Sequence, residues 1–241
     1  MRGRAHQLRN QVNSTKPLPK GRIYELLPET TGELPTQYAR RRLPASLMTQ
    51  LNTATDSPFR GAIATPTTPN GYIKDNSVLK MIENSLYDGA LYQYRDPRTG
   101  EGNEDTMVRH LVAFWSRVQG KWLFAWELPP RKSRLTHGVG IQCLGYVMDL
   151  LTAEIKPSQH SFDDILDGSL ELLERATAWT DGVWQLSPGD ERRWNGLQNT
   201  PNDVRKLTNL FIQLIRRQDG TGQLAIDIRS NLTNRSAAGL D

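Results

Sequence analysis

The residues best suited to chemistry are three cations in one short loop. Arg131, Lys132 and Arg134 follow two prolines and precede an apolar run, 135–155, whose spacing predicts a helix. Cationic side chains and the free N–H groups of a helix start together favour the binding of phosphate or another anion. A solvated basic loop that happens to precede a helix is the alternative. If the loop is an anion-binding site, these three side chains contact phosphate.

Two more basic clusters lie in the N-terminal part of the chain. Lys16 and Lys20 belong to a turn at 13–20 that also holds Asn, Ser and Thr, residue types that contact phosphate and equally build ordinary turns. The other cluster is expected to steer a polyanion by its charge. It consists of Arg40, Arg41 and Arg42.

Aromatic side chains offer a second way to hold nucleic acid. Trp194 follows Arg192 and Arg193, so stacking of its ring on a base is conceivable. Large rings more often serve packing, and the same holds for the other tryptophans. These are Trp115, Trp122, Trp126, Trp179 and Trp184. Packing is therefore the expected role of all six.

Groups able to perform acid–base or metal chemistry lack a recognised spacing. Asp163 and Asp167 lie near His160 in sequence, but the pattern does not match a metal-binding helix. Cys143, the single cysteine, lies in an apolar stretch typical of a buried small residue. We expect no metal, no cofactor and no chemistry from these residues. The alternative is a nucleotide-dependent or nuclease-type enzyme that uses the 131–137 region.

The composition is that of a soluble globular protein. The chain has 241 residues, 37% hydrophobic and 23% charged, with a formal net charge of +4. One cysteine excludes an internal disulfide framework and favours a reducing cytoplasm. No segment approaches the ~18 consecutive apolar residues of a membrane span, and no signal-peptide pattern follows the start. We expect a cytoplasmic protein with no membrane partner.

The charge is unevenly distributed along the chain. Residues 1–50 hold 9 Lys and Arg against 3 Asp and Glu, whereas residues 161–190 hold 1 basic and 7 acidic residues. Such polarity suits a basic face for nucleic acid and an acidic face turned away from it. Charged, solvated helices produce the same totals.

Apolar residues recur with helical period along most of the chain. After a Pro/Gly-rich break at 65–71, a helix is expected to begin at 75–77 and to end at Gly89, which would adopt a left-handed conformation. Further helices are expected at 107–118, at 135–155 and at 162–178. Pro44 suits the first turn of an earlier helix. The last helix has the clearest start, because Thr200 can cap it, Pro201 fits its first turn and Asp203 stands where a capping box places a carboxylate.

These patterns predict a mainly α-helical protein with little β-structure. We expect an irregular bundle of about five to seven helices. Three regions are expected: a proline-punctuated segment with short helices at 1–60, a helical domain at 61–218, and a disordered tail at 219–241.

Four segments together resemble the C-terminal portion of DGQHR-domain proteins. They read VNSTKPLPKGRIYELLP at 12–28, ATPTTPNGYIK at 64–74, PRKSRLTHG at 130–138 and WNGLQNTP at 194–201. The family is associated with bacterial DNA modification and phage defence, and includes relatives of the phosphorothioation regulator DndB. Its N-terminal half is similar to the ParB/sulfiredoxin fold and carries the Asp-Gly-Gln-His-Arg motif.

That motif is missing here, because none of the four Asp-Gly pairs is followed by Gln-His-Arg. The resemblance therefore implies a fragment: the non-catalytic helical part of such a protein, which binds nucleic-acid backbone or another protein of a DNA-modification system. The alternative is a purely structural helical module that packs against the missing ParB/sulfiredoxin-like half.

Overall fold

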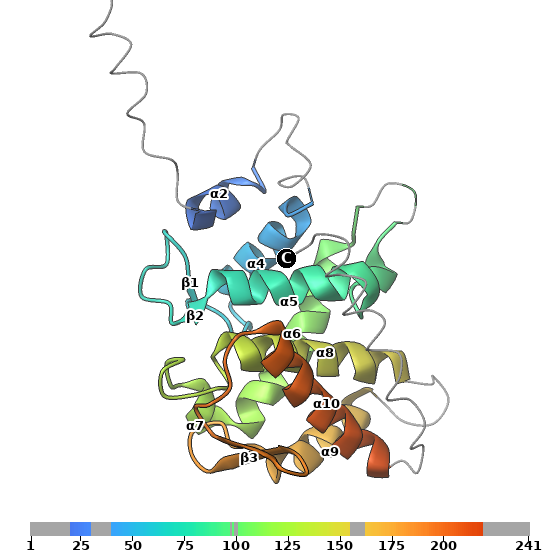
Figure 1. Cartoon of the computed structure of the whole chain (residues 1–241). Helices are drawn as coiled ribbons and strands as arrows, with labels where there is room; N and C mark the ends of the chain where they lie inside the picture. The colour runs from blue at the N-terminus through green and yellow to red at the C-terminus, as the bar shows by residue number, and fades with distance from the viewer. Residues whose placement is uncertain (1–19, 30–39, 97, 99–100, 155–161, 219–241) are drawn as a thin grey trace, which may run out of the picture.

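The computed structural model describes residues 20–29, 40–96, 98, 101–154 and 162–218. Within these ranges the chain forms eight α-helices, one 3-10 turn and four short strands, so the expectation of a mainly helical bundle is confirmed (Figure 1). The number of helices exceeds the five to seven expected, and it includes two short helices, α2 (Lys20–Leu26) and α7 (Leu123–Trp126). The expected tail at 219–241 lies outside the described residues.

The central element is α8 (Gly138–Glu154), which is buried along most of its length. It packs against α5 (Asp75–Asp88) and α10 (Pro201–Gln218). The remaining long helices complete the bundle around this layer: α4 (Arg42–Thr53) packs on α5 and α6 (Glu104–Lys121), and α9 (Phe162–Glu174) packs on α6 and α10. A 3-10 turn, η1 (Tyr92–Tyr94), follows α5.

The helices α5 and α8 run in the same direction (Figure 1). At their starts, Gly138 lies against the Ser77 hydroxyl. At their ends, Asp149 of α8 accepts hydrogen bonds from the Ser85 hydroxyl at 2.5 Å and from the Ala90 N–H at 2.8 Å. Contacts at both ends in this order require a parallel pair.

The helices α8 and α10 are parallel as well. Asn199, just before α10, lies against Gly138 at the start of α8 and accepts a hydrogen bond from Gln142. Near the other end, Arg216 of α10 forms a salt bridge with Glu154 of α8 at 3.3 Å. Three helices that point the same way, α5, α8 and α10, therefore begin at one end of the molecule.

Two small sheets flank this end. The strands β1 (Ile63–Ala64) and β2 (Ile73–Lys74) pair in parallel and lead directly into α5. The strands β3 (Val183–Ser187) and β4 (Asp190–Arg193) form an antiparallel hairpin that precedes α10. Gly189 closes its turn with a φ of +79°, a conformation that favours glycine. This hairpin was not expected from the sequence.

Most helix ends agree with their sequence signals. Pro44 lies in the first turn of α4, and the Thr200 hydroxyl accepts from the Asp203 N–H at 3.2 Å at the start of α10. The expected conformation of Gly89 was wrong, because its φ of −104° is extended rather than left-handed. Glycine is needed there for space, since a β-carbon would lie 2.3 Å from the Asp149 carboxyl carbon.

One hydrophobic cluster joins the bundle. It extends from Tyr24 of α2 to Ile215 of α10 and includes Leu47 of α4. The boundary expected at residue 60 therefore does not separate two cores. Cys143 is fully buried, which agrees with its expected role as a small core residue. The tryptophans expected in the core are buried, and these are Trp115, Trp122, Trp126, Trp179 and Trp184.

The acidic segment around α9 is partly neutralised by α6. Arg117 forms salt bridges with Asp163 at 3.1 Å and with Asp167 at 2.9 Å. One turn further along α6, Lys121 bridges Glu171 at 2.5 Å and a second carboxylate of the same helix. The charges predicted for an acidic face thus serve helix packing as well. No helix in the described ranges combines the length and hydropathy that a membrane span requires.

Candidate nucleic-acid interface

The starts of α5, α8 and α10, with the loops that lead into them, form one surface that we call the helix-start face. Its loops are residues 65–74, 127–137 and 194–200. Gly138 sits at its centre, where a β-carbon would lie 2.4 Å from the Asn199 side-chain nitrogen and 2.7 Å from the Ser77 hydroxyl. The glycine thus permits the three helix starts to meet, because it has no side chain to separate them.

Arg134 joins two loops of this face from inside. Its Nη1 donates to the Pro130 carbonyl at 2.8 Å, and its Nη2 donates to the Asn195 carbonyl at 2.7 Å. The guanidinium carbon also lies 5.7 Å from the centre of the Trp194 ring. Only 8% of Arg134 is exposed. This arrangement disagrees with the expectation that Arg134 contacts phosphate: both Nη groups bind the protein's own backbone, and the buried Nε has no hydrogen-bond partner within the described residues.

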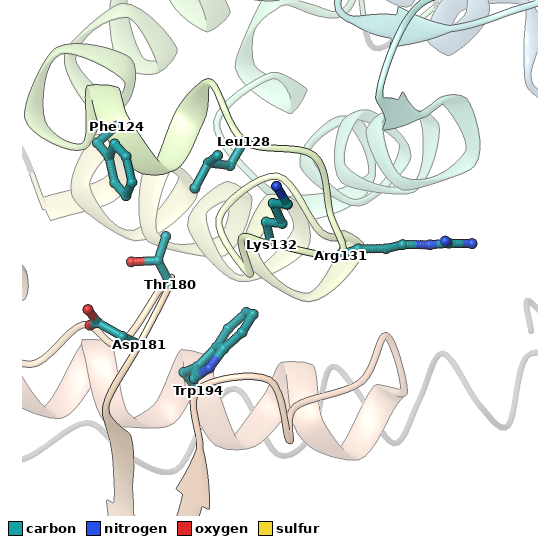
Figure 2. A pocket seen from close by; sticks show the side chains of 7 residues that line it. All are labelled: Phe124, Leu128, Arg131, Lys132, Thr180, Asp181 and Trp194. Atoms are coloured by element: carbon teal, nitrogen blue, oxygen red, sulfur yellow. The ribbon is translucent and has the colours of Figure 1, made fainter.

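Arg131 and Lys132 are exposed beside it and remain candidates for phosphate contact. The turn that carries them is held by the Pro129 carbonyl, which accepts from the Lys132 N–H at 2.7 Å and from the Ser133 N–H at 3.0 Å. Figure 2 shows the Arg131 side chain pointing away from the other side chains that line the pocket. Neither cation forms a salt bridge with any residue that the structure describes.

Lys74 adds a cation that the sequence analysis missed. It is exposed and immediately precedes α5. Lys74 also acts on His137 at the start of α8. Burial, the positive charge of Arg134 and the positive charge of Lys74, in that order of size, lower the pKa of the His137 imidazole to about 4. His137 is therefore neutral at pH 7, and its Nδ1 accepts from the Val139 N–H at 3.4 Å as a helix cap. Burial is the largest cause of this shift, and the charges of Arg134 and Lys74 add to it.

The helix α2 attaches to the edge of the same face and brings Lys20 to it. The Glu25 carboxylate accepts from the Thr67 N–H at 2.9 Å and from its hydroxyl at 2.6 Å. Gly21 lies against the Asp75 carboxylate, so the start of α2 lies next to the start of α5. Lys20 is exposed there, whereas Lys16 lies outside the described residues.

The arginines at 40–42 lie elsewhere on the molecule. Arg41 forms a salt bridge with Glu83 at 2.8 Å and donates to the Tyr24 hydroxyl. Since Glu83 follows Asp75 by two turns, this contact lies ~12 Å along α5 from its start. Arg40 and Arg42 are exposed at the start of α4. The structure therefore does not bring the cluster Arg40, Arg41 and Arg42 into the helix-start face.

A pocket opens on the helix-start face beside Arg131 and Lys132 (Figure 2). Its volume is about 300 Å³. Seven side chains line it: Phe124, Leu128, Arg131, Lys132, Thr180, Asp181 and Trp194. In Figure 2, Trp194 lies on one side of the pocket, Phe124 and Leu128 lie on the other, and Thr180 and Asp181 close one end. The combination is an open, shallow pocket with aromatic side chains on its walls and cations beside it.

The helix-start face also carries acidic groups. Glu127 is exposed in the loop 127–137, and Asp181 lines the pocket. The Asp75 carboxylate accepts from the Asn76 N–H at 2.6 Å, and Asp203 is buried with a hydrogen bond from the Gln198 N–H at 2.8 Å. In the described part of the chain, no group of three or more His, Cys, Asp and Glu side chains is arranged to hold a metal ion. The arrangement is suited to electrostatic binding of an anion.

The segments that carry the family resemblance meet at this face although they are far apart in sequence. Arg134 of the segment 130–138 binds Asn195 of the segment 194–201, and Glu25 of the segment 12–28 binds Thr67 of the segment 64–74. Comparison of the chain with known protein families, with curated proteins and with solved structures finds no match.

Proposed function

We propose that the helix-start face binds the phosphate backbone of nucleic acid and that the protein does so without chemistry of its own. The observation that carries this proposal is the shared start of three parallel helices beside unpaired cations. Each helix start presents the equivalent of about half a positive charge, so α5, α8 and α10 add to one positive region. Within the described residues, four exposed cations there form no salt bridge: Lys20, Lys74, Arg131 and Lys132.

Parallel packing of neighbouring helices carries an electrostatic cost that an anion would offset. Like ends of helix dipoles repel when they lie together, and an anion at their starts reverses the sign of that interaction. Gly138 supports the close approach of the starts of α5 and α10. A polyanion gains more from such a surface than a single phosphate does, because each contact releases a condensed counterion.

The resemblance to DGQHR-domain proteins suggests the setting of this binding. We propose that the chain serves a bacterial DNA-modification or defence system as a non-catalytic helical component. Support comes from the position of the four resembling segments, whose described parts meet at the helix-start face. The bound polymer would then be DNA.

Fluorescence anisotropy with a labelled DNA oligomer tests the proposal. We expect binding at low salt that weakens steeply as salt rises, because the log of the association constant falls by ~0.7 to 0.9 per phosphate contact for each log unit of salt. The variants Lys74→Gln, Arg131→Gln and Lys132→Gln should each weaken binding, and each should reduce the salt slope by about one contact.

Arg109→Gln is the matched control for charge. Arg109 is exposed on α6 and contacts Thr106, outside the helix-start face. This variant removes the same charge from another surface, so binding should change little. Absence of binding at low salt would overturn the proposal, and so would an equal loss of affinity in Arg109→Gln and Arg131→Gln.

A second candidate function is the docking of a protein partner on α7. Leu123 and Phe124 are 52% and 72% exposed, which is unusual for two adjacent large apolar residues. Sedimentation of the protein alone tests this alternative. Self-association that disappears in Leu123→Ser would support it, whereas a monomer at all concentrations would count against an apolar docking surface.

A further inference from the structure

We propose that the pocket between Phe124 and Trp194 holds one unpaired nucleobase, so that the nucleic acid bound at the helix-start face is single-stranded. This inference rests on the proposed function and specifies its ligand. The pocket supplies the three features that a base requires: aromatic or apolar walls, polar groups at one end and cations beside the opening.

The walls suit the faces of a planar ring. Trp194 lies on one side, and Phe124 and Leu128 lie on the other (Figure 2). Phe124 is 72% exposed, although an aromatic ring is expected to bury most of its surface. A base inserted beside Phe124 would cover that surface. Stacking of this kind occurs with every base, since each presents a π-face.

The Trp194 ring is held in place before any ligand arrives. Arg134 lies 5.7 Å from the ring centre and does not line the pocket, so it contacts Trp194 from outside the cavity. The Trp194 backbone is fixed as well, because its N–H donates to the Gly182 carbonyl and its carbonyl accepts from the Trp184 indole, each at 3.0 Å. A fixed ring loses little conformational freedom on binding, which favours affinity. The buried Arg134 thereby gains a positioning role.

The polar groups divide between the two ends of the pocket. Thr180 and Asp181 close the end that a base edge would reach, where a hydroxyl and a carboxylate can hydrogen-bond to ring and exocyclic atoms. Arg131 and Lys132 lie at the rim, where the phosphates that flank an inserted base would pass. A single pocket of about 300 Å³ is near the lower limit for small-ligand sites and suits one base.

This geometry selects against an intact duplex. Bases in a duplex are stacked and paired, so entry into the pocket would require that one be flipped out, which costs the free energy of its stacking and pairing. A single strand exposes its bases without that cost. Affinity for a single strand should therefore exceed affinity for a duplex of the same length by at least fivefold at equal salt.

An abasic oligomer separates the base pocket from backbone binding. The probe is a labelled single-stranded deoxycytidine oligomer of about 12 nucleotides, compared with an abasic strand of the same length. We expect the abasic strand to bind at least fivefold more weakly, and Phe124→Ser to bring the two strands to similar affinity. Trp194→Phe should abolish the quenching of tryptophan fluorescence that the deoxycytidine strand produces.

Tyr92→Ser is the matched control, because Tyr92 is 53% exposed and lies outside the pocket. It should leave the ratio of the two affinities unchanged. Equal binding of both strands to the unchanged protein overturns the base pocket while leaving backbone binding intact. Failure of both strands to bind at low salt overturns the proposed function itself, and tighter binding of the duplex overturns the single-strand assignment.

Discussion

Gly138 and Asn199 lie so close that a β-carbon at Gly138 would come within 2.4 Å of the Asn199 side-chain nitrogen. This contact joins the start of α8 to the residue before α10. Ser77 of α5 approaches the same point on the other side, at 2.7 Å from that β-carbon. The whole helix-start face therefore depends on the absence of one side chain.

Gly138→Ala should destabilise the protein, although alanine is normally the better helix residue. The added methyl group must displace Asn199 or Ser77, and overpacking in a dense region costs ~1 to 3 kcal/mol. Gly168→Ala is the control: Gly168 lies in α9 with no atom within 4 Å of the added carbon, so this change should stabilise by up to ~1 kcal/mol. Urea unfolding of the two variants measures both effects. Similar stability of both variants would contradict the close approach at Gly138.

Two neighbouring arginines should respond differently to the same substitution. Arg134→Gln removes hydrogen bonds from a charged donor to the Pro130 and Asn195 carbonyls, and should lower the free energy of unfolding by ~2 to 4 kcal/mol. Arg131→Gln alters an exposed side chain and should change stability by less than ~0.5 kcal/mol, while it weakens DNA binding. Thermal unfolding together with anisotropy distinguishes the two roles. A stable Arg134→Gln protein would show that the loops do not depend on this guanidinium.

The pH dependence of stability should report on His137. Its pKa is lowered from the ordinary 6.5 to about 4 by burial and by the charges of Arg134 and Lys74. Between pH 6.5 and pH 4, the unfolded chain therefore binds a proton that the folded protein does not bind. Stability is therefore complete above pH 6.5 and decreases as pH falls toward 4. Because His137 is half-buried, we expect a loss of ~1 to 3 kcal/mol over this window.

His137→Asn isolates this contribution. An asparagine oxygen can replace Nδ1 as the acceptor for the Val139 N–H, but it does not titrate. Urea unfolding at pH 7 and pH 5 should show a smaller loss for the variant. Some loss should persist, because burial also lowers the pKa of His110 between α6 and α8. Equal slopes in both proteins would mean that His137 is not held neutral.

The local structure could be predicted from the sequence because its signals are local. Thr200, Pro201 and Asp203 lie within a single helical turn, and the start of α10 follows from them. The β3–β4 hairpin is an exception. The Pro188-Gly189 pair marks its turn, but the strand that follows is too short and too charged to be recognised by its alternation.

The candidate site depends on relationships that no local signal contains. Lys74 and His137 interact only because α5 and α8 run parallel, which hydrophobic spacing does not specify. Arg131 and Arg134 belong to the same basic motif and are the same residue type, yet tertiary packing exposes the first and buries the second. Long side chains of the same type thus acquire opposite roles from their surroundings, and a basic motif alone does not distinguish them.

The end of the base pocket should discriminate between cytosine and uracil. Asp181 can only accept hydrogen bonds when ionised, so it pairs with the amino group of cytosine and repels the carbonyl oxygen that uracil carries at the same position. A single strand of deoxycytidine should bind more tightly than one of deoxyuridine, by about 1 kcal/mol or more per inserted base. Asp181→Asn presents both a donor and an acceptor and should bring the ratio close to one. Anisotropy at fixed salt measures all four affinities, and equal binding of the two strands to the unchanged protein would show that Asp181 does not read the base.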